Sequence, residues 1–183
     1  MRKGFTLVEL SIVLVIVGLL IGGVLKGKSM IENAKIKRVK SDVLGLIANM
    51  YSFQDKYGSL PGDNTLSIVG ATACAGNNNG LIDAAELDCA WQQLVSAKFL
   101  SGTGTIDNTT TAKKTPYTGY YRLGAGTTAT AAFYITTTAN VIPNEVIRSF
   151  DISDDDGVNN TGDVRSGTAY TSAANATLTW YAY

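Results

Sequence analysis

The densest group of side chains that could do chemistry is acidic and lies near the carboxyl end. Five aspartates crowd the glycine-containing stretch FDISDDDGVNNTGDVRSG, namely Asp151, Asp154, Asp155, Asp156 and Asp163. Carboxylates this close repel one another unless a cation or solvent screens them. Ligands that are all oxygen favour calcium, and extracellular calcium can occupy weak sites. The stretch therefore predicts a calcium site, and a solvated acidic turn is the alternative.

A weaker calcium candidate lies in the stretch CAGNNNGLIDAAELDC. With Gly80 aligned to the invariant glycine of an EF-hand loop, four side chains fall at ligand positions. They are Asn77, Asn79, Asp83 and Glu86. Ala75 stands at the first position and cannot bind a metal. The alternative is a capping box, in which Asp83 and Glu86 begin a helix that contains Leu87.

Two cysteines, Cys74 and Cys89, bracket this second loop, and the chain contains no histidine. Without histidine, two cysteines make a poor zinc site, and the commonest general base is missing as well. In an exported protein the pair would form a disulfide that stabilises the fold by about 3 kcal/mol. A pair of free buried thiols is the alternative.

The first element that must position these groups is an apolar segment at the amino terminus. From Phe5 to Leu25 the only charged residue is Glu9. As a helix this segment is long enough to cross a bilayer, for which about 20 residues suffice. A cleavable secretory signal is a poor alternative, because the run is too long and no small-residue cleavage site precedes Lys26. We predict a transmembrane helix over residues 5–25.

Helical periodicity continues beyond the apolar segment, over residues 26–57. Apolar residues recur there at spacings of three and four, at Ile36, Val39, Val43, Leu46, Met50, Phe53 and Tyr57. This pattern predicts an amphipathic helix that ends near Gly58, with Pro61 close behind. A coiled coil is the alternative for the stripe, but the stripe lasts only about three heptads and lacks regular flanking charges.

Residues 58–183 form the predicted globular head. The predicted strands are Tyr117–Leu123, Ala132–Thr137, Val146–Phe150 and Thr177–Tyr181. We expect an α+β fold, in which an antiparallel sheet packs on the amphipathic half of the long helix. From Ser41 onward there are seven basic and thirteen acidic residues, so we predict no specific nucleic-acid partner.

The stretch KGFTLVEL, from Lys3 to Leu10, resembles the prepilin motif of the type IV pilin superfamily, which includes type II secretion pseudopilins. The resemblance implies that residues 1–4 are a leader, removed after Gly4 by a dedicated prepilin peptidase that also methylates Phe5. Glu9 becomes the fifth residue of the mature chain and is implied to meet the terminal ammonium of a neighbouring subunit. The alternative is that Glu9 only reaches the lipid headgroups.

The resemblance also implies a function and a location. The expected function is a structural, non-enzymatic subunit of a pilus-like filament, which self-associates through the helix at residues 5–25. The expected location is the inner membrane with its assembly machinery, and then a periplasmic or extracellular filament. A secretion pseudopilin and a non-polymerising membrane-tethered binding module or adhesin are the alternatives. In the same family, pseudopilins bind calcium in an aspartate-rich carboxy-terminal loop, which the segment around Asp155 resembles.

Overall fold

The structure is a computed structural model that describes residues 4–65, 76–102, 107–108, 113–127, 131–172 and 174–182. The chain divides into two compact units, Met1–Arg38 and Val39–Tyr183. Helix α1 (Leu7–Tyr57) contributes residues to both units.

The first unit contains the apolar part of α1. Its large apolar side chains are exposed on every side, from Phe5 at 87% and Leu7 at 85% to Leu25 at 65%. By length and composition this part of the helix is able to cross a membrane. The continuous helix through Leu25 that the sequence predicts is confirmed.

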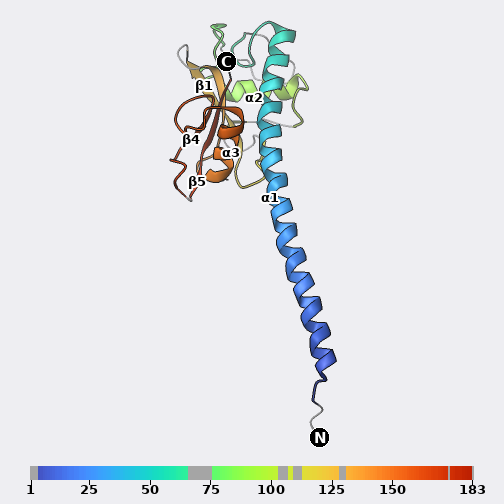
Figure 1. Cartoon of the computed structure of the whole chain (residues 1–183). Coiled ribbons are helices and arrows are strands. Elements are labelled where there is room, and N and C mark those ends of the chain that lie inside the picture. Colours follow the sequence, from blue (N-terminus) through green and yellow to red (C-terminus); the bar gives the residue numbers. More distant parts are fainter. Residues whose placement is uncertain are drawn as a thin grey trace. The chain divides into compact units, whose positions relative to one another are not determined.

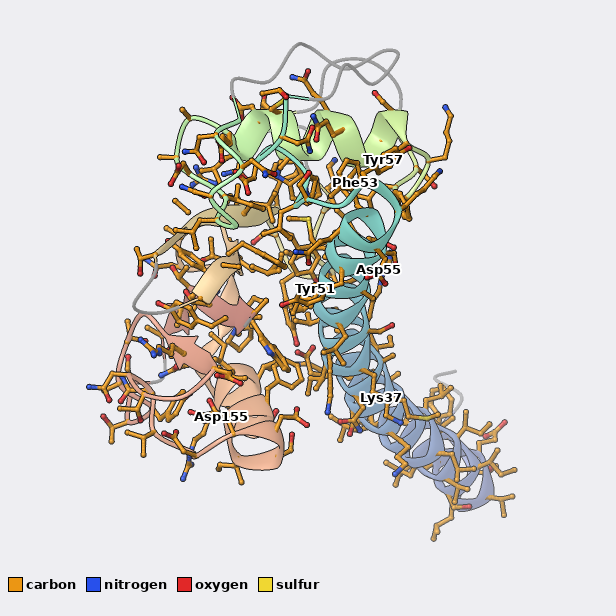
Figure 2. All side chains as sticks on the ribbon, turned by 90° about the horizontal axis from the view of Figure 1, so that it is seen from above. Lys37, Tyr51, Phe53, Asp55, Tyr57 and Asp155 are labelled. Carbon is orange, nitrogen blue, oxygen red and sulfur yellow. The ribbon has the colours of Figure 1, made fainter. Side chains whose placement is uncertain are left out.

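The second unit begins with the amphipathic part of α1. Five residues of the predicted stripe are buried, at Val39, Val43, Leu46, Met50 and Phe53. Figure 2 shows Tyr51 on the side of the helix that faces the strands, and Asp55, one turn later, is exposed. The ring centroids of Tyr51 and Phe133 lie 5.8 Å apart, so α1 packs directly on the sheet. The helix ends at Tyr57, and Gly58 follows with a φ of 81°, a conformation that suits glycine at a helix C-terminus.

A four-stranded antiparallel sheet forms the centre of the second unit. Its strands are β1 (Tyr121–Thr127), β2 (Ala131–Thr137), β6 (Leu178–Ala182) and β4 (Val164–Ser166), in that spatial order. Phe133 in β2 lies opposite Ala125 on one side and Ala182 on the other. Two short strands, β3 (Ile142–Pro143) and β5 (Asn175–Ala176), pair separately. The α+β fold with an antiparallel sheet is confirmed.

Two shorter helices complete the second unit. Helix α2 (Leu87–Ser96) lies beside the last turns of α1 in both views (Figures 1 and 2). Phe53 of α1 and Phe99, just after α2, have ring centroids 5.9 Å apart. Helix α3 (Asn144–Asp154) carries the first aspartates of the acidic stretch.

The strand predicted at Val146–Phe150 is wrong, because these residues lie in α3. Val146, Ile147 and Phe150 are buried, while Arg148 and Ser149 between them are exposed. Spacings of one and four residues put the three apolar side chains on one face of a helix. The β-branched residues suggested a strand, whereas the burial pattern has the period of a helix.

Candidate assembly and metal sites

Glu9 belongs to a hydrogen-bonded group at the start of α1. Its Oε2 atom accepts the backbone N–H of Thr6 and the Thr6 hydroxyl, both at 2.8 Å. In return the Glu9 backbone N–H donates to the Thr6 hydroxyl oxygen at 3.2 Å. These reciprocal bonds form a capping box, the motif in which a threonine and a glutamate three residues later satisfy the first free N–H groups of a helix.

The sequence prediction assigned Glu9 to a neighbour or to lipid headgroups and did not include this role. The signal was present, since Thr6-Leu-Val-Glu9 has the spacing of a capping box. Gly4 and Phe5, the predicted cleavage and methylation residues, are exposed next to it. Residues 1–3 of the predicted leader lie outside the described residues.

Three of the five aspartates predicted to bind calcium come together at the end of α3. Single carboxylate oxygens of Asp151, Asp155 and Asp156 all lie within 4.8 Å of one another. Asp151 is fully buried and accepts the hydroxyl of Tyr170 and, at 2.8 Å, the N–H of Gly157. Burial, followed by the hydrogen bond to Asp151, raises the pKa of Tyr170 far above its ordinary value, so the phenol stays protonated as a donor.

The other two members of this group have hydrogen bonds that fix the loop. Asp155 accepts the N–H of Val164 at 2.7 Å. Asp156 accepts the hydroxyl of Thr161 at 2.6 Å and the N–H of Val158 at 2.8 Å, and these bonds lower its pKa. A side chain at Gly162 would overlap the Asp155 carboxylate, so glycine is required where the loop passes closest to it.

Asp154 and Asp163 are not members of this three-carboxylate group. Asp154 forms an ion pair with Lys40 of α1, at 2.7 Å between Nζ and Oδ1. Partial burial opposes ionisation of Asp154, but the hydrogen bonds from Lys40 and Ser153 together with the charge of Lys40 outweigh it and lower the pKa. Burial raises the pKa of Asp163, and the nearby charge of Asp155 adds to the effect. The donor set of the remaining three is oxygen only, which fits calcium.

The residues of the weaker calcium candidate also meet, but their polar atoms bond to each other. The side-chain amides of Asn77 and Asn79 donate to Oδ2 of Asp83 at 2.8 and 3.2 Å. Glu86 accepts the N–H of Asp83 at 2.8 Å, directly before α2 begins at Leu87. This bond and the backbone bond from Glu86 N–H to the Asp83 carbonyl close a turn that leads into α2, whose N-cap residue is Glu86 without a side-chain cap hydrogen bond. The two side chains therefore serve the start of the helix, but one turn earlier than a capping box on α2 would require. Burial raises the pKa of Glu86.

Asp63 holds this loop in place, a role that the sequence analysis missed. Its side chain is 1% exposed, and its two carboxylate oxygens accept the N–H groups of Asn79 at 3.0 Å and Gly80 at 2.8 Å. The turn residues Pro61-Gly62-Asp63 gave a signal for a turn and none for a partner so distant in sequence.

Asp63→Asn is expected to destabilise the fold by about 1–3 kcal/mol, because the new amide group would point a donor at a backbone donor. Chemical denaturation of the full chain in detergent measures the change. Asp55→Asn is the matched control, since Asp55 is exposed, and it should change stability by less than about 0.5 kcal/mol. Equal stability of the two variants would contradict the role assigned to Asp63.

The predicted disulfide joins one described and one undescribed residue. Cys89 lies in α2, whereas Cys74 lies outside the described residues. The disulfide between Cys74 and Cys89 stays a prediction.

Comparison with known proteins identifies the amino-terminal segment. A family model, the prokaryotic N-terminal methylation motif, matches residues 1–25. No curated protein and no solved structure is significantly similar to the chain. The motif implies processing by prepilin peptidase, and together with the long apolar helix it fits a single-pass membrane-anchored protein. The chain therefore carries, over residues 1–25, the prepilin motif of type IV pilins and pseudopilins.

Proposed function

We propose that this protein is a structural subunit of a type IV pilus-like filament, with no catalytic role. The observation that carries the proposal is the methylation motif over residues 1–25, which includes the first part of α1 with its exposed apolar side chains. Burying a leucine or valine side chain stabilises by about 1.5–3 kcal/mol, so this surface needs lipid or neighbouring helices around it. In a filament, neighbouring helices would pack against this apolar surface once the subunit has left the membrane.

The proposed assembly uses Phe5 and Glu9 together. Cleavage after Gly4 creates a positively charged amino terminus at Phe5, which prepilin peptidase then methylates. A carboxylate in an apolar surrounding is costly unless it is paired, so Glu9 would favour the axial register in which it meets a neighbour's new terminus. The proposed partners are copies of the chain, the peptidase and an inner-membrane assembly machinery. The proposed locations are the inner membrane and then a periplasmic or extracellular filament.

Mass spectrometry of sheared surface filaments tests this proposal. We expect filaments whose dominant chain begins at a methylated Phe5. Gly4→Val should prevent cleavage and leave the full-length precursor in the membrane fraction. A Cβ at Gly4 would meet nothing within 4 Å, so the substitution does not disturb the fold. Any loss of filaments would therefore result from failed cleavage by the peptidase. Uncleaved chains in intact filaments would contradict the proposal.

A secretion pseudopilin is the second candidate, and the acidic loop favours it through its resemblance to the calcium-binding loop of those proteins. A filament confined to the periplasm, with loss of a secreted substrate on deletion, would support this candidate. A chain that is cleaved but stays monomeric in the membrane would support a tethered binding module or adhesin.

We also propose that calcium binds the group formed by Asp151, Asp155 and Asp156. A cation there would offset the repulsion among three carboxylates whose oxygens lie within 4.8 Å. Calcium at roughly 100 times its Kd would stabilise the fold by about 2.7 kcal/mol, which raises the melting temperature by about 5–10 °C. Thermal unfolding of the full chain in detergent, with calcium and with chelator, measures this shift.

Asp155→Asn is expected to remove most of the calcium-dependent shift. Asp88→Asn, at an exposed aspartate of α2, should keep the full shift. If neither calcium nor chelator changed the melting temperature, the calcium site would be wrong and the solvated acidic turn would be correct.

A further inference from the structure

The end of α3 carries an apolar surface that faces solvent. Ile152 is 60% exposed and Val158 is 48% exposed. Gly157 connects them, since a Cβ on Gly157 would lie 3.5 Å from Cγ1 of Ile152 and Val158 follows directly in the chain. Among the described residues after Val39, the other exposed large hydrophobic side chain is Leu44. We call Ile152 and Val158 the α3 patch.

The surroundings of the α3 patch are acidic. Asp154, Asp156 and Asp163 are exposed around it. Of the nearby cations, Lys40 pairs with Asp154 and the Arg165 guanidinium lies 4.3 Å from the ring centroid of Tyr181. Arg148, four residues before Ile152 on α3, is exposed and sets one positive charge against the three aspartates. A surface that fits the patch would therefore have an apolar centre flanked by positive charges.

The first unit of the chain contains such a surface. Met30 is 64% exposed, and the side chains of Lys26 and Lys37 are exposed as well. At 100° per residue, positions 26, 30 and 37 of a helix fall within about 40° of one another, with the lysines about 16 Å apart. Asn33 is exposed on the same face, whereas Ile31 lies about 100° farther round the helix than Met30. We call Lys26, Met30 and Lys37 the basic stripe.

We propose that the basic stripe of one copy docks on the α3 patch of a second copy. This inference rests on the proposed function, because it names the surfaces through which the filament subunits meet. Apolar contact between Met30 and the patch would remove exposed apolar area from water, and the lysines would lie against the aspartates. The contact joins different surfaces of the two copies, and a head-to-tail contact that does not close into a ring generates an open helical filament.

Cysteine cross-linking in cells tests the contact. One chain carries Met30→Cys and a co-expressed chain carries Val158→Cys, both otherwise full length. We expect a disulfide-linked dimer that contains one copy of each. Ser101→Cys replaces Val158→Cys in the matched control, because Ser101 is an exposed residue after α2, and it should give no dimer with Met30→Cys.

Charge reversal provides a second measurement on the same cross-link. Lys26→Glu with Lys37→Glu in the Met30→Cys chain should lower the dimer yield roughly fivefold, through loss of attraction and new repulsion. Lys98→Glu removes the same kind of exposed charge from the second unit and should change the yield by less than about twofold.

Electron microscopy of the unmodified chain separates the two proposals. Filaments without a Met30–Val158 cross-link, or with an equal cross-link to Ser101, would overturn the contact and leave the proposed function standing. A specific cross-link without filaments would support the contact and contradict the filament. If either cysteine variant fails to accumulate on an immunoblot, the pair Asn33→Cys and Ile152→Cys replaces it, because Asn33 is exposed on the same face as Met30, and the same outcomes decide.

Discussion

Glu9→Ala is expected to abolish surface filaments, while the chain is still cleaved and still accumulates in the membrane. Removal of the carboxylate leaves a neighbour's terminal ammonium without its partner in an apolar surrounding, where an unpaired charge is strongly unfavourable. We expect at least about a hundredfold fewer filaments, which corresponds to about 2.7 kcal/mol per subunit contact. Quantitative immunoblotting of sheared filaments against the membrane fraction measures this.

The capping box makes a sharper comparison possible. Alanine removes both the charge of Glu9 and its hydrogen bonds to Thr6. Glutamine keeps the ability to form a capping box and loses only the charge. Thr6→Ala does the reverse, since it removes the hydroxyl half of the box and leaves the carboxylate in place.

If pairing with the ammonium drives assembly, Glu9→Gln should lose filaments as fully as Glu9→Ala does. Thr6→Ala should then reduce filaments only modestly, because the loss of a helix cap costs about 1 kcal/mol. The opposite ranking, with Glu9→Gln near wild type and Thr6→Ala without filaments, would show that Glu9 acts through the helix terminus alone.

Phe53→Ala is expected to have the largest effect on the fold of the head. Phe53 is fully buried on α1, and its ring centroid lies 4.5 Å from that of Tyr57 and 5.9 Å from that of Phe99. A buried phenylalanine replaced by alanine loses its transfer free energy and leaves a cavity, which together cost about 3–5 kcal/mol. Because whole domains are stable by only about 5–15 kcal/mol, this is a large share of the total.

Denaturant unfolding of the full chain in detergent measures the effect of Phe53→Ala. Asp55→Ala is the matched control two residues away, at an exposed position of α1. It should change the free energy of unfolding by less than about 0.5 kcal/mol. Similar losses for both variants would mean that helix propensity at this end of α1, and not packing of Phe53, controls stability.

Periodicity predicted the long helix and its end because the signals there are local. The buried positions from Val39 to Phe53 follow the period of a helix, and Gly58 stops it. The same principle failed at Val146–Phe150, where a short apolar run fits either a strand or a helix. Pro143, directly before the first residue of α3, was the available sign of a helix start.

The candidate sites show what spacing in the sequence leaves undetermined. Five neighbouring aspartates predicted one acidic group, but the turn at the end of α3 directs Asp154 to Lys40, 114 residues earlier in the chain. The role of Asp63 was equally hidden, since the backbone N–H groups that it binds belong to residues 16 and 17 positions later in the chain. Partners distant in the sequence come from the tertiary fold, and no local pattern contains them.

The hydrogen bonds between Thr6 and Glu9 reduce the net free energy that Glu9 can contribute to assembly. Thr6 lies after the cleavage point, so the capping box is available to the mature chain as well as to the precursor. Before assembly, the Glu9 carboxylate of a subunit in the membrane is therefore already hydrogen-bonded to Thr6. Entry into a filament becomes an exchange of one set of partners for another, and the net gain is only the difference between them. In the proposed filament, a small difference would make the entry of a subunit reversible.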